Sequence, residues 1–183
     1  MNETLHQACN LINPKYKHVL EFGVYKGKTI RQLRDTLPLD FKLFGFDSFI
    51  GLPEDWSGTD IKKSTFNLNG NIPNVENVTF YKGWFKDTIP EYITIAEPIA
   101  LLHIDCDLYS STIEILYNLN SYIKRGTVIA FDEWVYNHQD LEKNRQHEQK
   151  AFNEWVNEFD IKFELIPRST DYVEMERQIV IIK

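Results

Sequence analysis

Short apolar segments alternate along the chain with segments whose apolar residues recur every three or four positions. Strand-like and helix-like segments in this order predict an α/β fold, with an open, mostly parallel sheet and helices on both of its faces. The predicted strands are His18–Gly23, Leu43–Asp47, Val78–Tyr81, Ile99–Asp105, Gly126–Asp132, Ile161–Ile166 and Gln178–Ile182. Ligands of such sheets bind beyond the carboxyl ends of the strands, so the residues that follow each strand matter most.

Four helices are expected, at residues 3–12, 29–37, 111–123 and 150–159. Ser111 and Glu114 have the spacing of a capping box, which predicts that the third helix opens there. The side chains expected to face the core from the last three helices are Ile30, Leu33 and Leu37, then Ile113, Leu116, Leu119 and Ile123, then Phe152, Trp155, Val156 and Phe159.

The length of the chain indicates a single domain over residues 1–183, because it is too short for two separate hydrophobic cores of ordinary size. Two polar segments, 53–77 and 134–149, are long for a compact domain and are expected to be functional loops. Since little chain precedes the first strand, we expect the segment 53–77 to act as a lid over the site.

Composition excludes several classes of protein. A hydrophobic content of 43% indicates a globular chain, and a formal net charge of -7 argues against a nucleic-acid partner. Cys9 and Cys106 do not make a disulfide framework. With no signal-peptide pattern and no apolar run of membrane-spanning length, we expect a cytoplasmic protein with no membrane partner.

Clustered carboxylates follow two of the predicted strands. Asp105 and Asp107 close the run Ile99–Ile104, and Asp132 and Glu133 close another apolar run. Carboxylates held together repel and raise each other's pKa, and a hard divalent cation with oxygen ligands removes that conflict. The pattern therefore predicts a metal-assisted site at one edge of the sheet. The role of Asp107 stays open: it could be a general base, a residue that supports the metal ligands from the second layer, or a helix cap.

The ends of the first two strands favour a nucleoside ligand. Glycines at 23 and 27 stand at a strand-to-helix turn, where a ligand can approach the backbone. The dinucleotide pattern G-x-G-x-x-G is absent, because Tyr25 occupies the place of its second glycine. Asp47, which ends the second strand, is placed to accept hydrogen bonds from ribose hydroxyls, and Phe49 to lie against a base.

Five segments in this order resemble the macrocin O-methyltransferase (TylF-type) family. They are EFGVYKG (21–27), FDSFIGLP (46–53), KGWF (82–85) with TIP (88–90), HIDCDLYSST (103–112) and FDEW (131–134). The resemblance covers roughly residues 18 to 155. It implies a Rossmann-like class I methyltransferase fold, with a seven-stranded, mostly parallel sheet whose last strand is antiparallel, and it implies S-adenosyl-L-methionine and Mg²⁺ as cofactors.

The resemblance also assigns roles to individual residues. The implied cofactor-binding residues are Glu21, Gly23, Tyr25, Gly27, Thr29, Asp47, Ser48, Phe49, Gly83, Trp84 and Asp105. The implied metal ligands are Asp105, Asp132 and Glu133, where the family more often has two aspartates in the second pair. Asp105, Asp107 and His138 are the candidate catalytic residues; His147 is expected to be a loop histidine and His103 a packed one.

These observations favour an O-methyltransferase that acts on a hydroxyl of a sugar or another small metabolite, as a monomer or homodimer. The residues Asp105 to Tyr109 differ from the Pro-Pro-aromatic pattern of nucleic-acid amino-methyltransferases, which favours an oxygen acceptor. Three alternatives remain open: transfer of the aminocarboxypropyl group from the same cofactor, a nucleotide-binding or NAD-linked Rossmann protein, and an inactive relative with a structural role.

Overall fold

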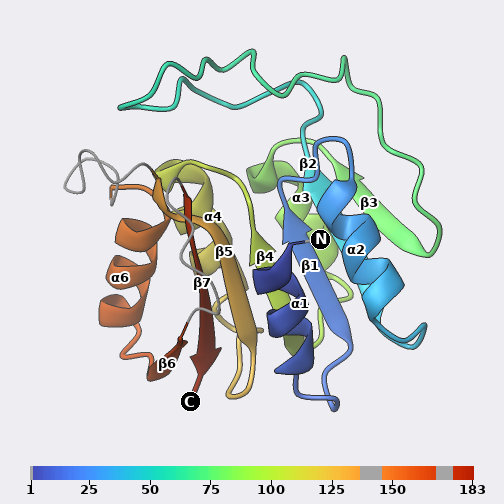
Figure 1. The fold of residues 1–183 in the computed structure, drawn as a ribbon, viewed down its shortest axis with the longest axis vertical. Coiled ribbons are helices and arrows are strands. Elements are labelled where there is room, and N and C mark those ends of the chain that lie inside the picture. Colours follow the sequence, from blue (N-terminus) through green and yellow to red (C-terminus); the bar gives the residue numbers. More distant parts are fainter. Residues whose placement is uncertain (1, 137–145, 168–174) are drawn as a thin grey trace.

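The computed structural model describes residues 2–136, 146–167 and 175–183, and shows one seven-stranded sheet (Figure 1). The strand order is β3-β2-β1-β4-β5-β7-β6, and only β7 runs antiparallel to its neighbours. The predicted fold class is confirmed. The strands are β1 (His18–Phe22), β2 (Lys42–Asp47), β3 (Val78–Lys82), β4 (Ile99–Ile104), β5 (Val128–Tyr136), β6 (Phe163–Ile166) and β7 (Met175–Ile182).

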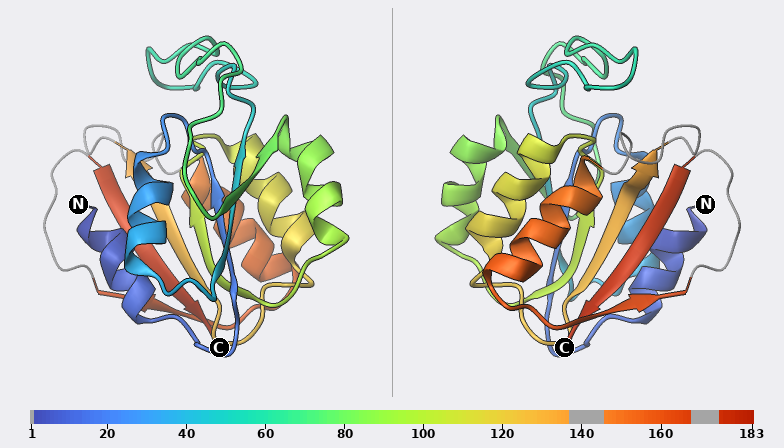
Figure 2. Two further views of the ribbon diagram at one scale, coloured as in Figure 1. Left: turned by 90° about the vertical axis from the view of Figure 1, so that its right-hand side faces the viewer. Right: turned by 90° about the vertical axis from the view of Figure 1, so that its left-hand side faces the viewer.

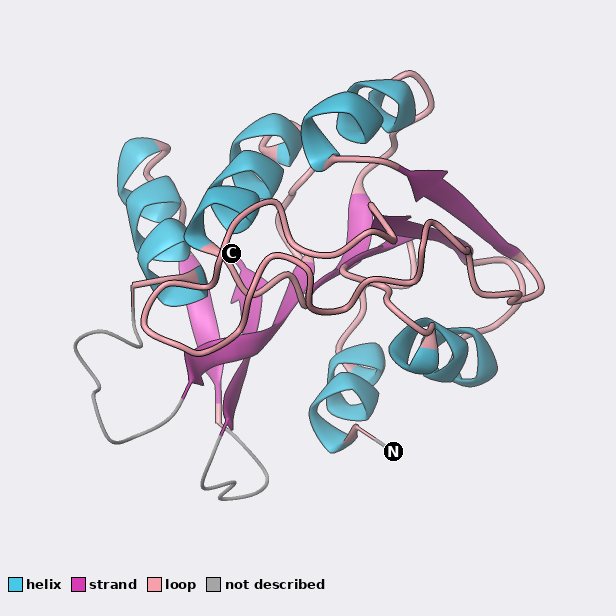
Figure 3. Cartoon of the chain, turned by 90° about the horizontal axis from the view of Figure 1, so that it is seen from above, coloured by secondary structure: helices cyan, strands magenta, loops and turns pink. Residues whose placement is uncertain are grey.

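Helices cover both faces of the sheet (Figures 2 and 3). One face carries α1 (Glu3–Asn10) and α2 (Lys28–Thr36), and the other carries α3 (Phe85–Ile93), α4 (Tyr109–Leu119) and α6 (Glu148–Glu158). None of the helices in the described ranges is long and apolar enough to cross a membrane.

Helix α3 was not predicted from the sequence. Pro90 lies inside it, and proline lacks the amide hydrogen that a helix interior needs. The helix forms nonetheless, because Ile89 and Tyr92 are fully buried against the sheet. Tertiary packing here outweighs a local helix-breaking residue.

The expected start and inner face of α4 need correction. The helix begins at Tyr109, its N-cap is Leu108, and no side chain caps it. Ser111 is therefore a buried residue of the first turn, and the predicted capping box is wrong. Ile115 is fully buried whereas Ile113 is half-buried, because the earlier start brings a different set of positions onto the sheet.

The inner face of α6 is close to the prediction. Phe152, Trp155 and Val156 are buried in the core. Phe159 is wrong as a core residue: it is 39% exposed and meets the edge of Tyr117, with the ring centroids 5.2 Å apart. Phe159 follows the last helical residue, where the chain has already turned away from the sheet.

Strand β5 continues beyond the acidic pair. Its pairing with β7 shifts register between Phe131 and Val135, so that Asp132 and Glu133 lie within the strand and not after it. Residues 134–136 are accordingly strand and not loop, and α6 already includes residues 148 and 149. Irregular pairing of this kind re-aims side chains and is common beside active sites.

The sheet order places a crevice between β1 and β4. Strand β1 pairs with β2 on one side and with β4 on the other, so the connections leave the sheet in opposite directions there. Ligands of open α/β sheets bind at such a switch point, outside the carboxyl ends of the strands. The segment 53–77 passes over these ends (Figure 1).

Candidate active site

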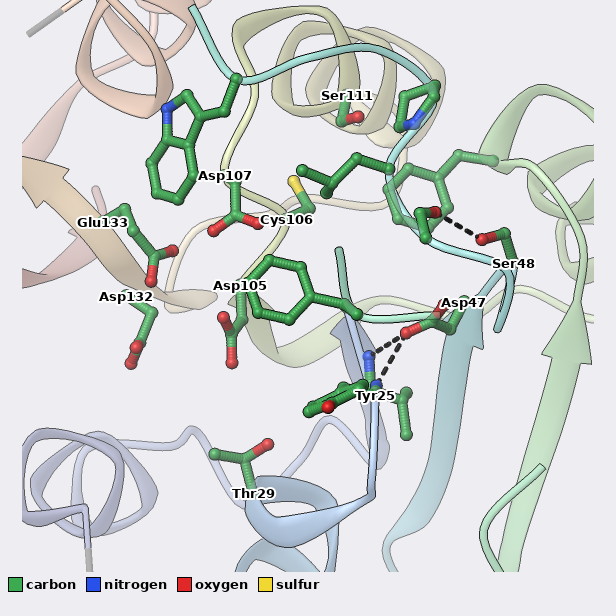
Figure 4. Close-up of a pocket in the computed structure, with 18 of the residues that line it drawn as sticks. Tyr25, Thr29, Asp47, Ser48, Asp105, Cys106, Asp107, Ser111, Asp132 and Glu133 are labelled. Atoms are coloured by element: carbon green, nitrogen blue, oxygen red, sulfur yellow. Dashed lines mark hydrogen bonds between the residues drawn. The ribbon is translucent and has the colours of Figure 1, made fainter. Parts of the chain in front are cut away.

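A cavity of about 1080 Å³ opens at the carboxyl ends of β1, β2, β4 and β5. Most of the predicted site residues line it: Gly23, Tyr25, Thr29, Asp47, Ser48, Gly83, Trp84, Asp105, Asp107, Asp132 and Glu133. Figure 4 shows the four carboxylates of Asp105, Asp107, Asp132 and Glu133 gathered on one side of the cavity, across from Asp47.

Three predicted cofactor residues do not line the cavity. Phe49 is fully buried and its ring meets the edge of Phe80, so the structure places it in the core. Gly27 is the N-cap of α2 in a left-handed conformation, and Glu21 lies in the floor beneath the cavity. His138 lies outside the described residues.

Gly23 allows β1 and β4 to approach each other at the floor of the cavity. Its φ is +92°, and a Cβ built on it would stand 1.7 Å from the carbonyl oxygen of Asp105. The amide of Asp105 donates to the carbonyl of Phe22 at 2.9 Å. Only glycine fits this position, so the sequence signal at residue 23 has a steric cause.

Asp47 ties the turn after β1 to the end of β2. One carboxylate oxygen accepts the amides of Val24 and Tyr25 at 2.9 and 2.7 Å (Figure 4). The other accepts the amide of Phe49 at 2.6 Å. A carboxylate offers about four lone-pair sites, so about one stays free for a ligand hydroxyl. The predicted ribose-binding role remains a prediction.

A row of buried ionisable groups crosses the sheet below the cavity. Glu21 accepts the hydroxyl of Thr29 at 2.9 Å, and its other oxygen is 3.1 Å from Nδ1 of His103. Nε2 of His103 is 3.9 Å from Asp132. Burial by itself lowers the pKa of His103, but the two carboxylates outweigh it and hold that pKa well above its usual value. The row therefore places His103 between two acidic side chains, Glu21 and Asp132.

Asp132 continues this row to the last strand and the N-terminal segment. Its Oδ1 accepts from Nε of Arg177 at 2.5 Å and from the side-chain amide of Asn2 at 3.1 Å, and its Oδ2 accepts from Nη2 of Arg177 at 3.1 Å. Burial favours a high pKa, yet the hydrogen bonds from His103 and Arg177 hold the pKa of Asp132 well below its usual range. Asp132 is thus an ionised carboxylate with protein partners.

Asp105, Asp107 and Glu133 form a second group, in which one oxygen of each lies within 4.8 Å of the others. Burial and neighbouring carboxylates raise all three pKa values: those of Asp105 and Glu133 well above the usual range, and that of Asp107 to about 7. Oε2 of Glu133 is buried and has no hydrogen-bond partner in the described part of the chain. These unpaired oxygens fit a divalent cation, which would neutralise them.

Glu148 is a buried carboxyl that sequence reasoning missed. It begins α6, is fully buried, and its Oε2 accepts the amide of Glu133 at 3.1 Å. Burial and the nearby Asp105 raise its pKa well above the usual range. The sequence shows only an acidic residue at the start of an amphipathic helix. Arg177 was missed as well, because nothing in a strand pattern pairs it with Asp132.

The segment 53–77 is attached to the body of the protein at both sides of the cavity. On one side Nε2 of His147 lies 3.0 Å from the carbonyl of Ser57, and its ring meets the edge of Trp56. On the other side Phe66 packs edge-on against Tyr25 with a centroid distance of 5.4 Å. His147 is therefore a contact residue of this segment, and burial lowers its pKa.

Comparison with known proteins assigns the chain to a family. A family model described as macrocin-O-methyltransferase (TylF) matches residues 16–163. The chain belongs to the TylF family. Its fold is also that of class I S-adenosylmethionine-dependent methyltransferases, since solved structures that share it include complexes with S-adenosylhomocysteine and S-adenosylmethionine.

Two curated relatives resemble this TylF-family chain over most of its length. Demethyldecarbamoylnovobiocin O-methyltransferase of Streptomyces niveus is 29% identical in an alignment 181 residues long, gaps included, which covers 87% of this chain and 65% of the relative. The 8-demethyl-8-(2,3-dimethoxy-α-L-rhamnosyl)-tetracenomycin-C 4'-O-methyltransferase of Streptomyces olivaceus is 29% identical over 64% of this chain and 52% of its own length. The chain thus spans less than two thirds of either relative.

Among solved structures, the calicheamicin methyltransferase CalS11 superimposes with a TM-score of 0.70 and 21% identity, covering 98% of this chain and 76% of CalS11. At this identity the likeness shows a shared fold. The TylF-family motifs therefore lie on a methyltransferase fold.

Proposed function

We propose that this TylF-family protein is an S-adenosylmethionine-dependent, magnesium-dependent O-methyltransferase that acts on a hydroxyl of a sugar or another small metabolite. One observation carries the proposal: the carboxylates of Asp105, Asp107 and Glu133 converge beside a large cavity at the β1–β4 switch point. The sugar-directed reaction named for the Streptomyces olivaceus relative supports a glycosidic acceptor.

The cofactor and the acceptor would occupy different parts of the cavity. Gly23, Thr29 and Asp47 would border the methionine and ribose parts of the cofactor, and Gly83 and Trp84, at the end of β3, its adenine. Trp84 is half-buried at the cavity wall, which suits stacking on a base. The four clustered carboxylates lie along the side of the cavity formed by β4 and β5, where the acceptor hydroxyl would meet the methyl group.

Asp105 and Glu133 would hold the cation, with Asp132 as the third predicted ligand. When bound, a divalent cation lowers the pKa of a coordinated hydroxyl and makes its oxygen a better nucleophile. Asp132 accepts three hydrogen bonds from Arg177 and Asn2, so about one of its four lone-pair sites remains for a cation.

Asp107 is the carboxyl best suited to accept the proton of the acceptor hydroxyl. It lines the cavity, and no hydrogen bond occupies its side chain among the described residues. A general base must lie within hydrogen-bond reach of the proton that it accepts. The acceptor oxygen would bond to the methyl carbon, the carbon–sulfur bond would break, and Asp107 would keep the proton.

The test is methyl transfer to saccharide and glycosylated acceptors, followed by product mass, with Mg²⁺ and with EDTA. We expect transfer to require Mg²⁺ and Asp107→Asn to lower kcat by about 10²- to 10⁴-fold. Asp105→Asn should remove most of the activity, and the activity that remains should no longer depend on Mg²⁺. Glu114→Gln is the matched control, because Glu114 lines the same cavity outside the carboxylate cluster.

Undiminished transfer in EDTA, or full activity of Asp105→Asn, would contradict the metal-assisted mechanism. A product heavier by an aminocarboxypropyl group instead of a methyl group would assign the other transfer reaction to the same site.

A further inference from the structure

Arg177 lines the cavity although no motif marks it. It reaches from β7 towards α1 and α2, and shares this end of the cavity with Asn2, Lys28, Thr29 and Gln32. Its side chain is 28% exposed, so the guanidinium is open to the cavity while it pairs with Asp132. A partly exposed arginine at a cavity wall is placed to bind an anionic group.

The arginine has donors left over after that pairing. Nε and Nη2 bond to the two oxygens of Asp132, at 2.5 and 3.1 Å. Nη1 makes no hydrogen bond to any residue that the structure describes. The Nη1–Nη2 edge of a guanidinium is the fork that binds a carboxylate with two parallel hydrogen bonds.

The other polar side chains at this end already donate elsewhere. Thr29 donates to Glu21 at 2.9 Å, Gln32 donates to the carbonyl of Asn2 at 2.8 Å, and Asn2 donates to Asp132 at 3.1 Å. Lys28, at the start of α2, is exposed. Arg177 and Lys28 are therefore cationic candidates for an anion here; of the other lysines that line the cavity, Lys26 lies over the ring of Tyr25 and Lys86 belongs to α3.

We propose that Arg177 binds the carboxylate of the methionine part of the cofactor through Nη1 and the free hydrogen of Nη2, while Nε and the other hydrogen of Nη2 keep their bonds to Asp132. The inference rests on the proposed function, since it needs S-adenosylmethionine in this cavity. It assigns to the last strand a role in cofactor recognition that no motif indicates.

Asp132 keeps its bonds to Arg177 when the cofactor binds. Nη2 carries two hydrogens, so one can stay on Oδ2 of Asp132 while the other joins Nη1 in the fork. Oδ2 accepts only this one bond, so it has a lone pair left to offer to a cation beside Asp105. The arginine keeps this carboxylate ionised and oriented before the ligands arrive.

The experiment compares S-adenosylmethionine with decarboxylated S-adenosylmethionine, which lacks only the carboxylate, by calorimetric titration of the full chain. We expect the wild type to prefer the carboxylated form by about 10- to 100-fold, the range for hydrogen bonds to a charged group. Arg177→Gln should reduce this preference to about twofold, and Lys28→Gln, the matched control at the same end, should retain it. The two ligands differ in net charge, so the acidic cluster affects them unequally; Lys28→Gln removes the same charge as Arg177→Gln and therefore controls for this general effect.

Arg177→Lys keeps a positive charge beside Asp132 but loses the fork, so it should show an intermediate preference and remains informative if Arg177→Gln does not fold. A wild-type preference retained in Arg177→Gln, or lost in Lys28→Gln, would overturn the assignment. A wild type that binds both forms equally would also overturn it and leave the proposed function standing. A wild type that binds neither form would remove both.

Discussion

Replacing Gly23 by alanine tests the close approach of β1 and β4 on which the site is built. The added Cβ would stand 1.7 Å from the carbonyl oxygen of Asp105, well inside van der Waals contact, and this neighbour is backbone and cannot rotate away. The turn after β1 must therefore move off β4, or the end of β4 must move off the turn.

The magnitude follows from what that movement breaks. A left-handed backbone costs an alanine about 1–2 kcal/mol. This movement would lengthen or break two hydrogen bonds. The amide of Asp105 donates to the carbonyl of Phe22 at 2.9 Å, and the amide of Gly23 donates to the carbonyl of Phe46 at 3.0 Å. Each contributes about 1 kcal/mol, so Gly23→Ala should lower the free energy of unfolding by about 3–4 kcal/mol.

Gly58→Ala is the matched control. Gly58 has a φ of +84°, close to the +92° of Gly23, but no atom lies within 4 Å of the Cβ position. It should lose only the backbone cost of about 1–2 kcal/mol. In thermal unfolding followed by circular dichroism, the additional loss of about 2 kcal/mol in Gly23→Ala corresponds to a melting temperature about 4–8 °C below that of Gly58→Ala. Equal melting temperatures for the two variants would refute the steric argument.

Two further outcomes are expected. His147→Ala removes the contacts to Ser57 and Trp56, so hydrogen exchange measured by mass spectrometry should become faster across residues 53–77; unchanged protection would mean that His147 does not hold this segment. The pKa of Asp107 rises from 3.8 to about 7 on folding, so the folded chain binds more protons than the unfolded chain in this interval. Stability in EDTA should therefore fall as the pH rises from about 4 to about 7. The free energy of unfolding, measured by urea titration at each pH, should fall less steeply with pH for Asp107→Asn than for the wild type. An identical pH dependence would contradict the raised pKa of Asp107.

The fold followed from local patterns to a large extent. Strands β1, β2 and β4 are short, mostly apolar segments whose residues are mostly buried. The sequence predicts them because parallel strands covered on both faces need such apolar runs. Helix α3 escaped prediction because Pro90 contradicts the local rule, and burial of Ile89 and Tyr92 decides the matter only after the sheet is assembled.

The acidic ends of the strands were recognisable in the sequence for a similar reason. Asp105 and Asp107 follow a buried run directly, and charges in that position need a partner or a ligand. The order of motifs around them indicated the TylF family, which the family model confirms over residues 16–163. Candidate ligands and the methyltransferase fold were thus accessible without coordinates.

Tertiary structure alone decided how these carboxylates are divided. Asp132 pairs with Arg177, 45 residues away, and the amide of Glu133 donates a hydrogen bond to Glu148, 15 residues away. No periodicity encodes such pairs, because they depend on the antiparallel return of β7 and on where α6 begins. The sequence by itself determined which residues carry charge at the sheet edge; the packing of distant strands and helices determined which charges are already satisfied and which remain for a ligand.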